Sequence, residues 1–302
     1  MKIELTGSTG FVGQNISKYL KDRGVDCNSI SLRDLNWNTT IRSNSDAIIH
    51  LAGKAHDTSN TSRPEEYFEI NRDLTIKLFD FFVTSDIRDF FYFSSVKAIA
   101  DEIDGPLYED EIPNPHTPYG RSKLAAEQYL LKQNLPSNKR LFIIRPCMIH
   151  GPGNKGNLNL LYKVVKKGIP WPLAAYNNLR SFIFIDNLCF LIYKILLDNN
   201  LASNVFNFAD DDPISTNELV RIIGDTLGLS TKLIALPKSL INTVVKFGDY
   251  LPLPLNSERL KKLTDSYVVS NEKVKSTLNV KELPIRAQDG LKLTIQSFNN
   301  VK

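Results

Sequence analysis

Tyr119 and Lys123, at the two ends of the run Tyr-Gly-Arg-Ser-Lys, are the residues of this chain whose types and spacing most directly suggest chemistry. Residues four apart on a helix lie on one face, so a helix here would place the phenol beside the ammonium. A neighbouring ammonium favours the phenolate and lowers a phenol pKa that is ordinarily about 10. Such a phenol can take a proton from a hydroxyl group while hydride leaves the same carbon, or return the proton in the reverse direction.

The Tyr-x-x-x-Lys spacing arises by chance in many helices, and two further features give it weight. A glycine-rich turn opens the chain at residues 7–13, and Ser94-Ser95 end a strand-like run before Tyr119. Small residues let a backbone approach a pyrophosphate, and the N-terminus of the following helix offers amide donors. The residues of this turn that we expect to bind a dinucleotide are Gly7, Thr9, Gly10, Phe11, Val12 and Gly13.

Strand-like and helix-like segments alternate through the first half of the chain. The expected strands are residues 3–6, 27–32, 46–51, 90–93, 141–144 and 204–209. The expected helices are residues 12–20, 65–85 and 122–133, and a strand followed by a helix is expected within residues 181–197. Strands separated by helices predict an α/β fold with a parallel sheet and right-handed crossovers.

The pattern changes after Gly153, where prolines and asparagines interrupt regular structure, and beyond Pro213 it is mostly helical. We expect residues 1–150 to form a dinucleotide-binding domain to which residues 181–209 return. Residues 151–180 and 210–302 would then form a smaller, mostly helical substrate-binding lobe over the carboxyl edge of the sheet.

The composition is that of a globular protein with a mild charge. Of the 302 residues, 42% are hydrophobic and 23% are charged, which argues against global disorder. The net charge of +4, from 37 basic and 33 acidic residues, lacks the concentrated basic face of a nucleic-acid-binding protein. The three cysteines and four histidines do not show metal-ligand spacing, so no metal is expected.

No segment of the sequence reaches the length of a membrane span. The most apolar run, residues 188–197, is about half as long as a bilayer requires and contains Lys194. The N-terminal residues show no basic-then-apolar secretory signal, and the scattered cysteines fit a reducing compartment. We therefore expect a cytoplasmic protein without membrane insertion.

The glycine spacing G-x-x-G-x-x-G, followed in order by Ser94-Ser95, Tyr119-x-x-x-Lys123 and Arg145-Pro146, resembles that of the extended short-chain dehydrogenases/reductases. Within them the chain looks most similar to the nucleotide-sugar epimerase, ketoreductase and dehydratase branch. The resemblance implies a Rossmann-type doubly wound sheet, a nicotinamide cofactor and a nucleotide-sugar substrate. It also implies a homodimer formed by two long helices, for which residues 65–85 and 122–133 are candidates.

The resemblance gives three residues catalytic roles. Tyr119 would be the general acid/base, Lys123 would hold the nicotinamide ribose and lower the Tyr119 pKa, and Ser95 would hydrogen-bond the reacting oxygen of the substrate. Ser95 is preferred to Ser94 because in similar proteins the serine directly before a Val-Lys-like pair takes this role. Sugar 4,6-dehydratases carry an Asp-Glu pair where this chain has Val96-Lys97, which argues against a dehydratase.

The end of the second strand, near Ser31, should select the cofactor. It carries no carboxylate, and Arg33 could pair with a 2′-phosphate, so we favour NADP over NAD, although Asp34 could reach a ribose in a shifted register. Asp46 and the turn of Leu51, Ala52 and Gly53 match the family's adenine and ribose-pyrophosphate contacts.

The sequence indicates the substrate-binding residues less clearly than the cofactor-binding residues. Arg180 matches an arginine that grips the substrate diphosphate in similar enzymes, and Asn157 lies in a loop expected near the sugar. The leading hypothesis is an epimerase or 4-ketoreductase acting at C4 of a UDP-hexose or UDP-N-acetylhexosamine. The alternative is a non-catalytic protein of the same fold that binds a dinucleotide as a sensor or scaffold.

Overall fold

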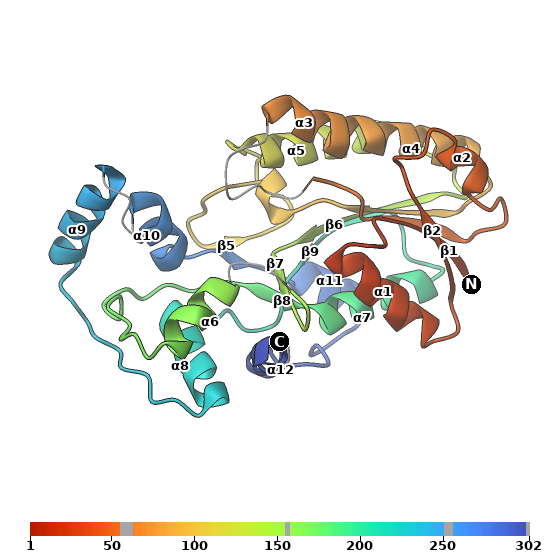
Figure 1. The fold of residues 1–302 in the computed structure, drawn as a ribbon. Helices are drawn as coiled ribbons and strands as arrows, with labels where there is room; N and C mark the ends of the chain where they lie inside the picture. The colour runs from red at the N-terminus through yellow and green to blue at the C-terminus, as the bar shows by residue number, and fades with distance from the viewer. Residues whose placement is uncertain (55–62, 155–157, 251–255, 300–302) are drawn as a thin grey trace.

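The structure is a computed structural model that describes residues 1–54, 63–154, 158–250 and 256–299. Its centre is a six-stranded sheet in the order β2-β1-β3-β4-β6-β9, in which every neighbouring pair is parallel (Figure 1). The strands are β1 (Lys2–Thr6), β2 (Asp26–Ile30), β3 (Ala47–His50), β4 (Asp89–Phe93), β6 (Arg140–Pro146) and β9 (Asn204–Phe208). The predicted α/β fold with a parallel sheet is confirmed.

The chain leaves β1 in one direction to β2 and then returns to pair β3 on the other side of β1. In an open parallel sheet such a reversal leaves a crevice at the carboxyl ends of the two central strands, where ligands bind. The connection from β2 to β3 is short and contains only a one-turn helix, α2 (Trp37–Thr40). Strand β2 is an edge strand of the sheet.

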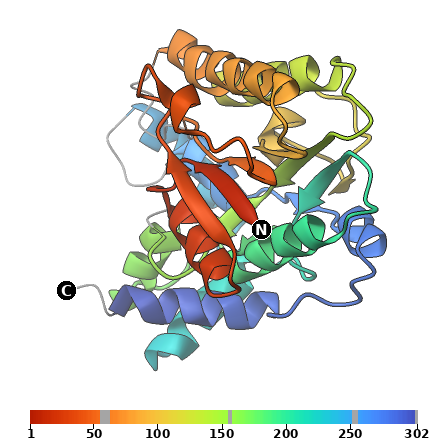
Figure 2. The same ribbon diagram turned by 90° about the vertical axis from the view of Figure 1, so that its right-hand side faces the viewer.

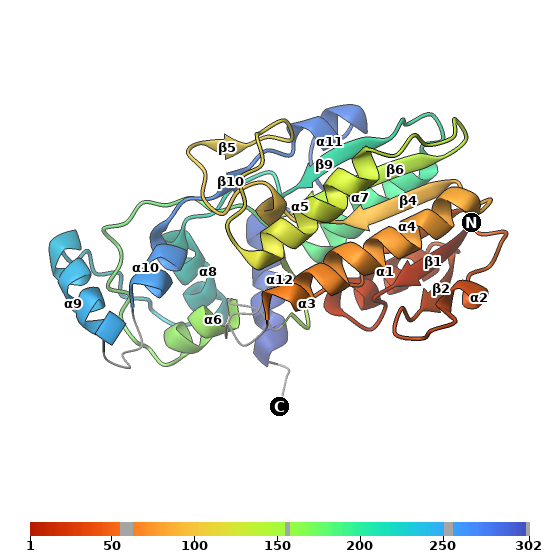
Figure 3. The same cartoon turned by 90° about the horizontal axis from the view of Figure 1, so that it is seen from above.

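Helices cover both faces of the sheet, as seen from above in Figure 3. One face packs against α1 (Phe11–Lys21) and α7 (Ile185–Leu197). The other packs against a long broken helix and α5 (Pro118–Leu131). Strand β4 contributes side chains to the hydrophobic cores on both faces of the sheet. Phe91 and Phe93 pack in the first core, while Phe90 and Tyr92 pack in the second.

The broken helix corresponds to the one predicted over residues 65–85. It consists of α3 (Pro64–Phe68), a π-helical turn η1 (Glu69–Asp73) and α4 (Leu74–Thr84). The sequence pattern did not indicate the π turn. Asn71 lies within it and is fully buried.

Most of the remaining elements lie beyond the carboxyl ends of the sheet strands, to the left in Figure 1 and behind the sheet in the view of Figure 2. The remaining helices are α6 (Leu158–Lys166), α8 (Thr216–Leu227), α9 (Lys238–Tyr250), α10 (Ser257–Thr264) and α12 (Ala287–Asn299), with α11 (Glu272–Thr277) against β9. The remaining strands are short: β5 (Pro106–Leu107) pairs β10 (Val268–Val269), and β7 (Met148–His150) pairs β8 (Phe182–Phe184).

Only part of residues 181–209 joins the main sheet. Strand β9 joins the sheet and α7 packs on it, whereas β8 pairs β7 outside it. Within the described residues no helix combines the length and the apolar character needed to cross a membrane.

We expect Gly13→Ala to destabilise the fold strongly, because a Cβ at Gly13 would lie 2.2 Å from the carbonyl oxygen of Gly7. Forced overpacking of this kind costs about 1–3 kcal/mol. Urea unfolding measures it, with Gly10→Ala as the matched control. Gly10 has a φ of −76° and the atom nearest to a Cβ there would be 3.4 Å away, so alanine fits. Equal stability of the two variants would contradict this account of the turn.

Candidate active site

The turn after β1 is shaped to receive an anion. Gly7 has a φ of +68°, and a Cβ there would lie 2.7 Å from the backbone nitrogen of Ala52. Helix α1 begins after Gly10 with no side-chain cap and no acidic residue in its first turn. Its N-terminal amides and partial positive charge are therefore available to a phosphate group, and a dinucleotide pyrophosphate fits this turn.

The other residues predicted around this turn lie at the same edge of the sheet. Thr9 is exposed and its carbonyl accepts a hydrogen bond from Gln14 at 3.0 Å, while Phe11 and Val12 are half-buried against the first core. The backbone nitrogen of Ala52 donates to Thr6 Oγ1 at 3.2 Å, which holds the residues after β3 against the end of β1.

Asp46 lies at the opposite edge, and its assignment to the cofactor site is wrong. It precedes β3, and its carboxylate accepts a hydrogen bond from the backbone nitrogen of Lys2 at 2.6 Å. Since β1 and β3 are parallel, this is the amino edge of the sheet, a full strand away from the glycine turn. Asp46 aligns the starts of two strands and does not face the cofactor crevice.

Tyr119 and Lys123 share one face of α5, as predicted. The helix begins earlier than residue 122: Thr117 caps it by accepting from the Gly120 nitrogen at 3.2 Å, and Pro118 occupies its first turn. Tyr119 is half-buried and Lys123 is 5% exposed. The Lys123 ammonium donates to the Phe93 carbonyl at 2.7 Å and lies 5.0 Å from the centre of the Tyr92 ring.

Gly53, just after β3, lies close to Lys123 and Asn71. A Cβ on Gly53 would lie 2.9 Å from Asn71 Oδ1 and 3.3 Å from Lys123 Nζ. Asn71 in turn accepts from the Lys54 nitrogen at 2.7 Å and donates to Ser122 Oγ at 3.0 Å. The π turn thus fixes the β3 end against α5, beside Lys123.

Ser95, and not Ser94, contacts Tyr119. Burial raises the Tyr119 pKa, a hydrogen bond with Ser95 lowers it, and the nearby Tyr67 phenol raises it. Ser95 Oγ also accepts from the Lys97 nitrogen at 3.2 Å, whereas Ser94 Oγ is buried and makes no hydrogen bond within the described part of the chain.

The predicted effect of Lys123 on the Tyr119 pKa does not hold in this structure. The pKa of Tyr119 lies above its ordinary value, and the group that lowers it is Ser95. Burial lowers the pKa of Lys123 itself to about 8, against a smaller opposite effect of the Glu127 carboxylate. The Lys123 ammonium bonds a backbone carbonyl. The phenol is protonated at neutral pH because its pKa lies above the ordinary value of about 10.

Arg180 is held on the lobe side of the site. Burial lowers its pKa, and its guanidinium donates to the Lys262 carbonyl. Arg33 follows β2 and is exposed, and no carboxylate lies at the tip of that strand. Asn157 lies outside the described residues.

Sequence reasoning gave no role to Tyr267. This buried tyrosine hydrogen-bonds the turn that follows Ser95. It stands between a serine and a valine in no recognisable motif, so no local signal marks it.

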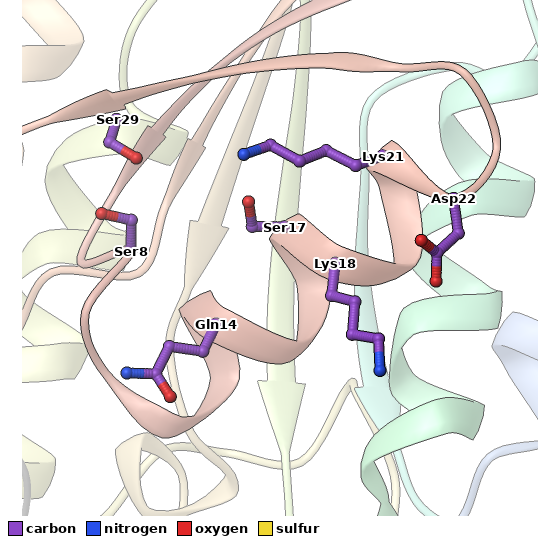
Figure 4. A pocket seen from close by; sticks show the side chains of 7 residues that line it. All are labelled: Ser8, Gln14, Ser17, Lys18, Lys21, Asp22 and Ser29. Carbon is purple, nitrogen blue, oxygen red and sulfur yellow. The ribbon is translucent and has the colours of Figure 1, made fainter.

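A polar hollow of about 400 Å³ adjoins the glycine turn (Figure 4). It runs between α1 and β2 and is lined by Ser8, Gln14, Ser17, Lys18, Lys21, Asp22 and Ser29. In Figure 4 the Lys21 side chain extends across Ser17 toward the side where Ser29 lies, while Lys18 points away. The hollow is open because the short β2–β3 connection places no long helix over this part of α1.

Residues 3–209 match the model of the family described as "NAD dependent epimerase/dehydratase family". The sequence is 31% identical over 321 residues to a UDP-glucose 4-epimerase of Vibrio cholerae, covering 98% of this chain and 95% of that protein. The fold is similar to a Thermus thermophilus UDP-glucose 4-epimerase complex with NAD, with a TM-score of 0.76, 19% identity and 100% of both chains covered. It is also similar to RMD from Pseudomonas aeruginosa complexed with NADPH, with a TM-score of 0.75, 19% identity and 99% of both chains covered.

The buried Lys123 predicts a specific pH dependence of stability. Its pKa is about 8 in the folded protein against 10.5 ordinarily, so the unfolded chain binds more protons between these pH values. The free energy of unfolding should therefore rise with pH across this window, by about 3 kcal/mol for this one group. Denaturant unfolding of the wild type and of Lys123→Met from pH 7.5 to 10.5 measures the difference. Parallel curves for the two proteins would contradict the burial of this ammonium.

Proposed function

The chain belongs to the NAD dependent epimerase/dehydratase family, and on that basis we propose that it oxidises or reduces C4 of a UDP-hexose or UDP-N-acetylhexosamine, as an epimerase or 4-ketoreductase. It is an enzyme that uses a nicotinamide dinucleotide on nucleotide sugars, since its relatives are epimerases and reductases of such sugars. The observation that carries the proposal is the hydrogen bond between Ser95 and Tyr119 at the carboxyl edge, beside Lys123 and the glycine turn.

In the oxidative direction Tyr119 would accept the proton of the C4 hydroxyl while hydride leaves C4. In the reductive direction the Tyr119 hydroxyl would donate its proton to the C4 carbonyl oxygen. A bound nicotinamide supplies the hydride acceptor or donor and, when oxidised, a positive ring charge that favours the phenolate. Ser95 would hydrogen-bond the same oxygen and stabilise the charge that develops there.

Tyr119 is protonated in the free enzyme. Its pKa lies above the ordinary value of about 10, so at neutral pH it carries the proton that the reductive direction would give to a ketone. Lys123 would exchange part of its bond with the Phe93 carbonyl for the ribose hydroxyls of the cofactor. Arg180, on the lobe side, would bind the diphosphate, because it is half-buried and bonds a carbonyl and no carboxylate among the described ion pairs.

The sensor or scaffold alternative is less well supported. It predicts a site in which the acid/base residues are absent or separated, and here Ser95 and Tyr119 contact each other with Lys123 one turn away on α5.

The proposal is tested by incubating the purified enzyme with UDP-glucose, UDP-galactose and their N-acetylamino counterparts. An epimerase would produce the C4 epimer without net cofactor change. A ketoreductase run backwards would form reduced cofactor and a 4-keto sugar in equal amounts. Absence of both products with every sugar and both cofactors would contradict the proposal.

We expect Tyr119→Phe to lower kcat by about 10²–10⁴ while leaving cofactor affinity unchanged, because it removes only the transferable proton. Tyr129→Phe is the matched control: it lies on the same helix and its hydroxyl bonds Asp80 at the surface. Turnover by Tyr119→Phe at the wild-type rate would remove this residue from the mechanism.

For the cofactor, we propose NADP in preference to NAD. Solved neighbours carry either NADPH or NAD, and the support here is the exposed Arg33 after β2 with Lys21 in the adjoining hollow. Both cations could bind a 2′-phosphate, and the end of β2 carries no carboxylate that would repel it.

We expect Arg33→Ala to weaken NADP binding about tenfold and to leave NAD binding unchanged, because a charge-assisted hydrogen bond to phosphate contributes about 1.5–3 kcal/mol. Calorimetric titration measures both affinities, with the exposed Arg221→Ala on α8 as control. Equal loss of affinity for the two dinucleotides, or tighter binding of NAD by the wild type, would contradict the choice of NADP.

A further inference from the structure

Tyr267 reaches from the C-terminal part of the chain into the turn that carries Ser95. It is 7% exposed, and its hydroxyl lies 2.7 Å from the Ala100 carbonyl oxygen and 3.3 Å from that of Val96. These two carbonyls bracket the single 3₁₀ turn η2 (Val96–Ala98) and the two residues after it. The one phenol proton is shared between these carbonyls, with the closer contact to Ala100, so the hydroxyl joins both ends of the turn.

Backbone hydrogen bonds and the packing of α5 also restrain this turn. The nitrogens of Ala98 and Ile99 donate to the carbonyls of Ser95 and Val96 at 2.9 and 3.0 Å. On its far side a Cβ at Gly120, in the first turn of α5, would lie 2.3 Å from the Lys97 carbonyl oxygen. The turn thus lies between Tyr267 and the helix that carries Tyr119.

Lys97 holds the Tyr267 ring in place. Its ammonium lies 4.0 Å from the ring centre and donates to the Asp101 carbonyl at 2.8 Å. A cation at this distance over an aromatic face is attracted by the ring, and more strongly when it is removed from water. Within the described residues Lys97 forms no ion pair with a carboxylate. Its ammonium instead contacts the Tyr267 ring and the Asp101 carbonyl.

The backbone of Tyr267 is bonded on both sides of Arg180. Its nitrogen donates to the Leu179 carbonyl at 2.8 Å, and its carbonyl accepts from the Ser181 nitrogen at 2.9 Å. The same residue therefore joins the segment of Arg180, the proposed diphosphate ligand, to the segment of Ser95.

We propose that Tyr267 is a positioning residue: its hydroxyl fixes the turn of residues 96–100 so that Ser95 keeps its hydrogen bond with Tyr119, and its backbone links that turn to Arg180. Its effect on turnover depends on the function proposed above, whereas its effect on the turn does not. A phosphate group bound by Arg180 would therefore also help, through Tyr267, to keep Ser95 in its position beside Tyr119.

The effect on the turn is tested in the enzyme without substrate. Tyr267→Phe removes the hydroxyl and leaves the ring beneath Lys97. Amide hydrogen exchange of residues 96–100 should become at least tenfold faster. The control is Tyr162→Phe, a tyrosine on α6 that is 6% exposed and packs against Phe298, away from this turn. Unchanged exchange in Tyr267→Phe would overturn the proposal.

The effect on catalysis is tested with the sugar that the wild type converts. We expect Tyr267→Phe to lower kcat about tenfold with KM within twofold, and cofactor affinity to stay unchanged. The Ser95 bond lowers the Tyr119 pKa, so weakening it should move the Tyr119-dependent limb of the pH–kcat profile to higher pH. Among the described residues, the other titratable groups near Tyr119 include Tyr67, with its Lys54–Glu66 ion pair, Tyr92 and Lys123, and the substitution leaves all of them in place.

The outcomes separate the two proposals. Faster exchange without activity on any sugar by the wild type would leave the positioning role standing and contradict the proposed function. An active wild type with an unshifted pH profile and unchanged kcat in Tyr267→Phe would overturn the positioning role alone.

Discussion

The hydrogen bond from the Lys123 ammonium to the Phe93 carbonyl, at 2.7 Å, is the interaction on which the arrangement of this site depends. It joins α5 to the carboxyl end of β4, so that Tyr119, one turn earlier on α5, comes beside Ser95, two residues beyond Phe93. The same ammonium lies near Gly53, three residues after β3, where a Cβ would be 3.3 Å from Lys123 Nζ and 2.9 Å from Asn71 Oδ1. One buried cation thereby fixes the contact between two segments of the carboxyl edge, close to the point where the glycine turn of β1 also arrives.

The electrostatics of this cation change the usual expectation for a Tyr-Lys pair. Burial lowers the pKa of Lys123 to about 8 and holds that of Tyr119 above its ordinary value, so near neutral pH the free site contains an ammonium beside a protonated phenol. The phenol is therefore ready to donate a proton, and a phenolate would need further stabilisation from a bound ligand. Ser95 has a larger part in this preparation than the sequence suggested, because its bond is the one that lowers the phenol pKa.

The sequence predicted those parts of the molecule that are specified by local patterns. The parallel sheet follows from short apolar runs between amphipathic segments, and the glycine turn and the Tyr119–Lys123 face follow from spacing alone. Residue contacts that depend on distant segments could not be predicted. Asp46 was assigned to the wrong edge because its role was taken from a motif resemblance, whereas its place at the start of a parallel strand puts it at the amino edge, opposite the edge where ligands bind. The π turn at Asn71 and the reach of Tyr267 across 167 residues to Ala100 leave no periodic signal, since each is set by tertiary packing.

The central claim is that Lys123 and Tyr119 together face the nicotinamide end of a bound dinucleotide, and a crystal structure of the enzyme with oxidised cofactor tests it most directly. We expect the Lys123 ammonium within about 3.2 Å of a nicotinamide ribose hydroxyl. The Tyr119 hydroxyl should be bonded to Ser95 and face the nicotinamide ring, with room for a pyranose carbon about 3–3.5 Å from that ring. A dinucleotide bound at the glycine turn whose ribose lies out of reach of Lys123, or a Tyr119 hydroxyl directed away from the ring, would contradict the account.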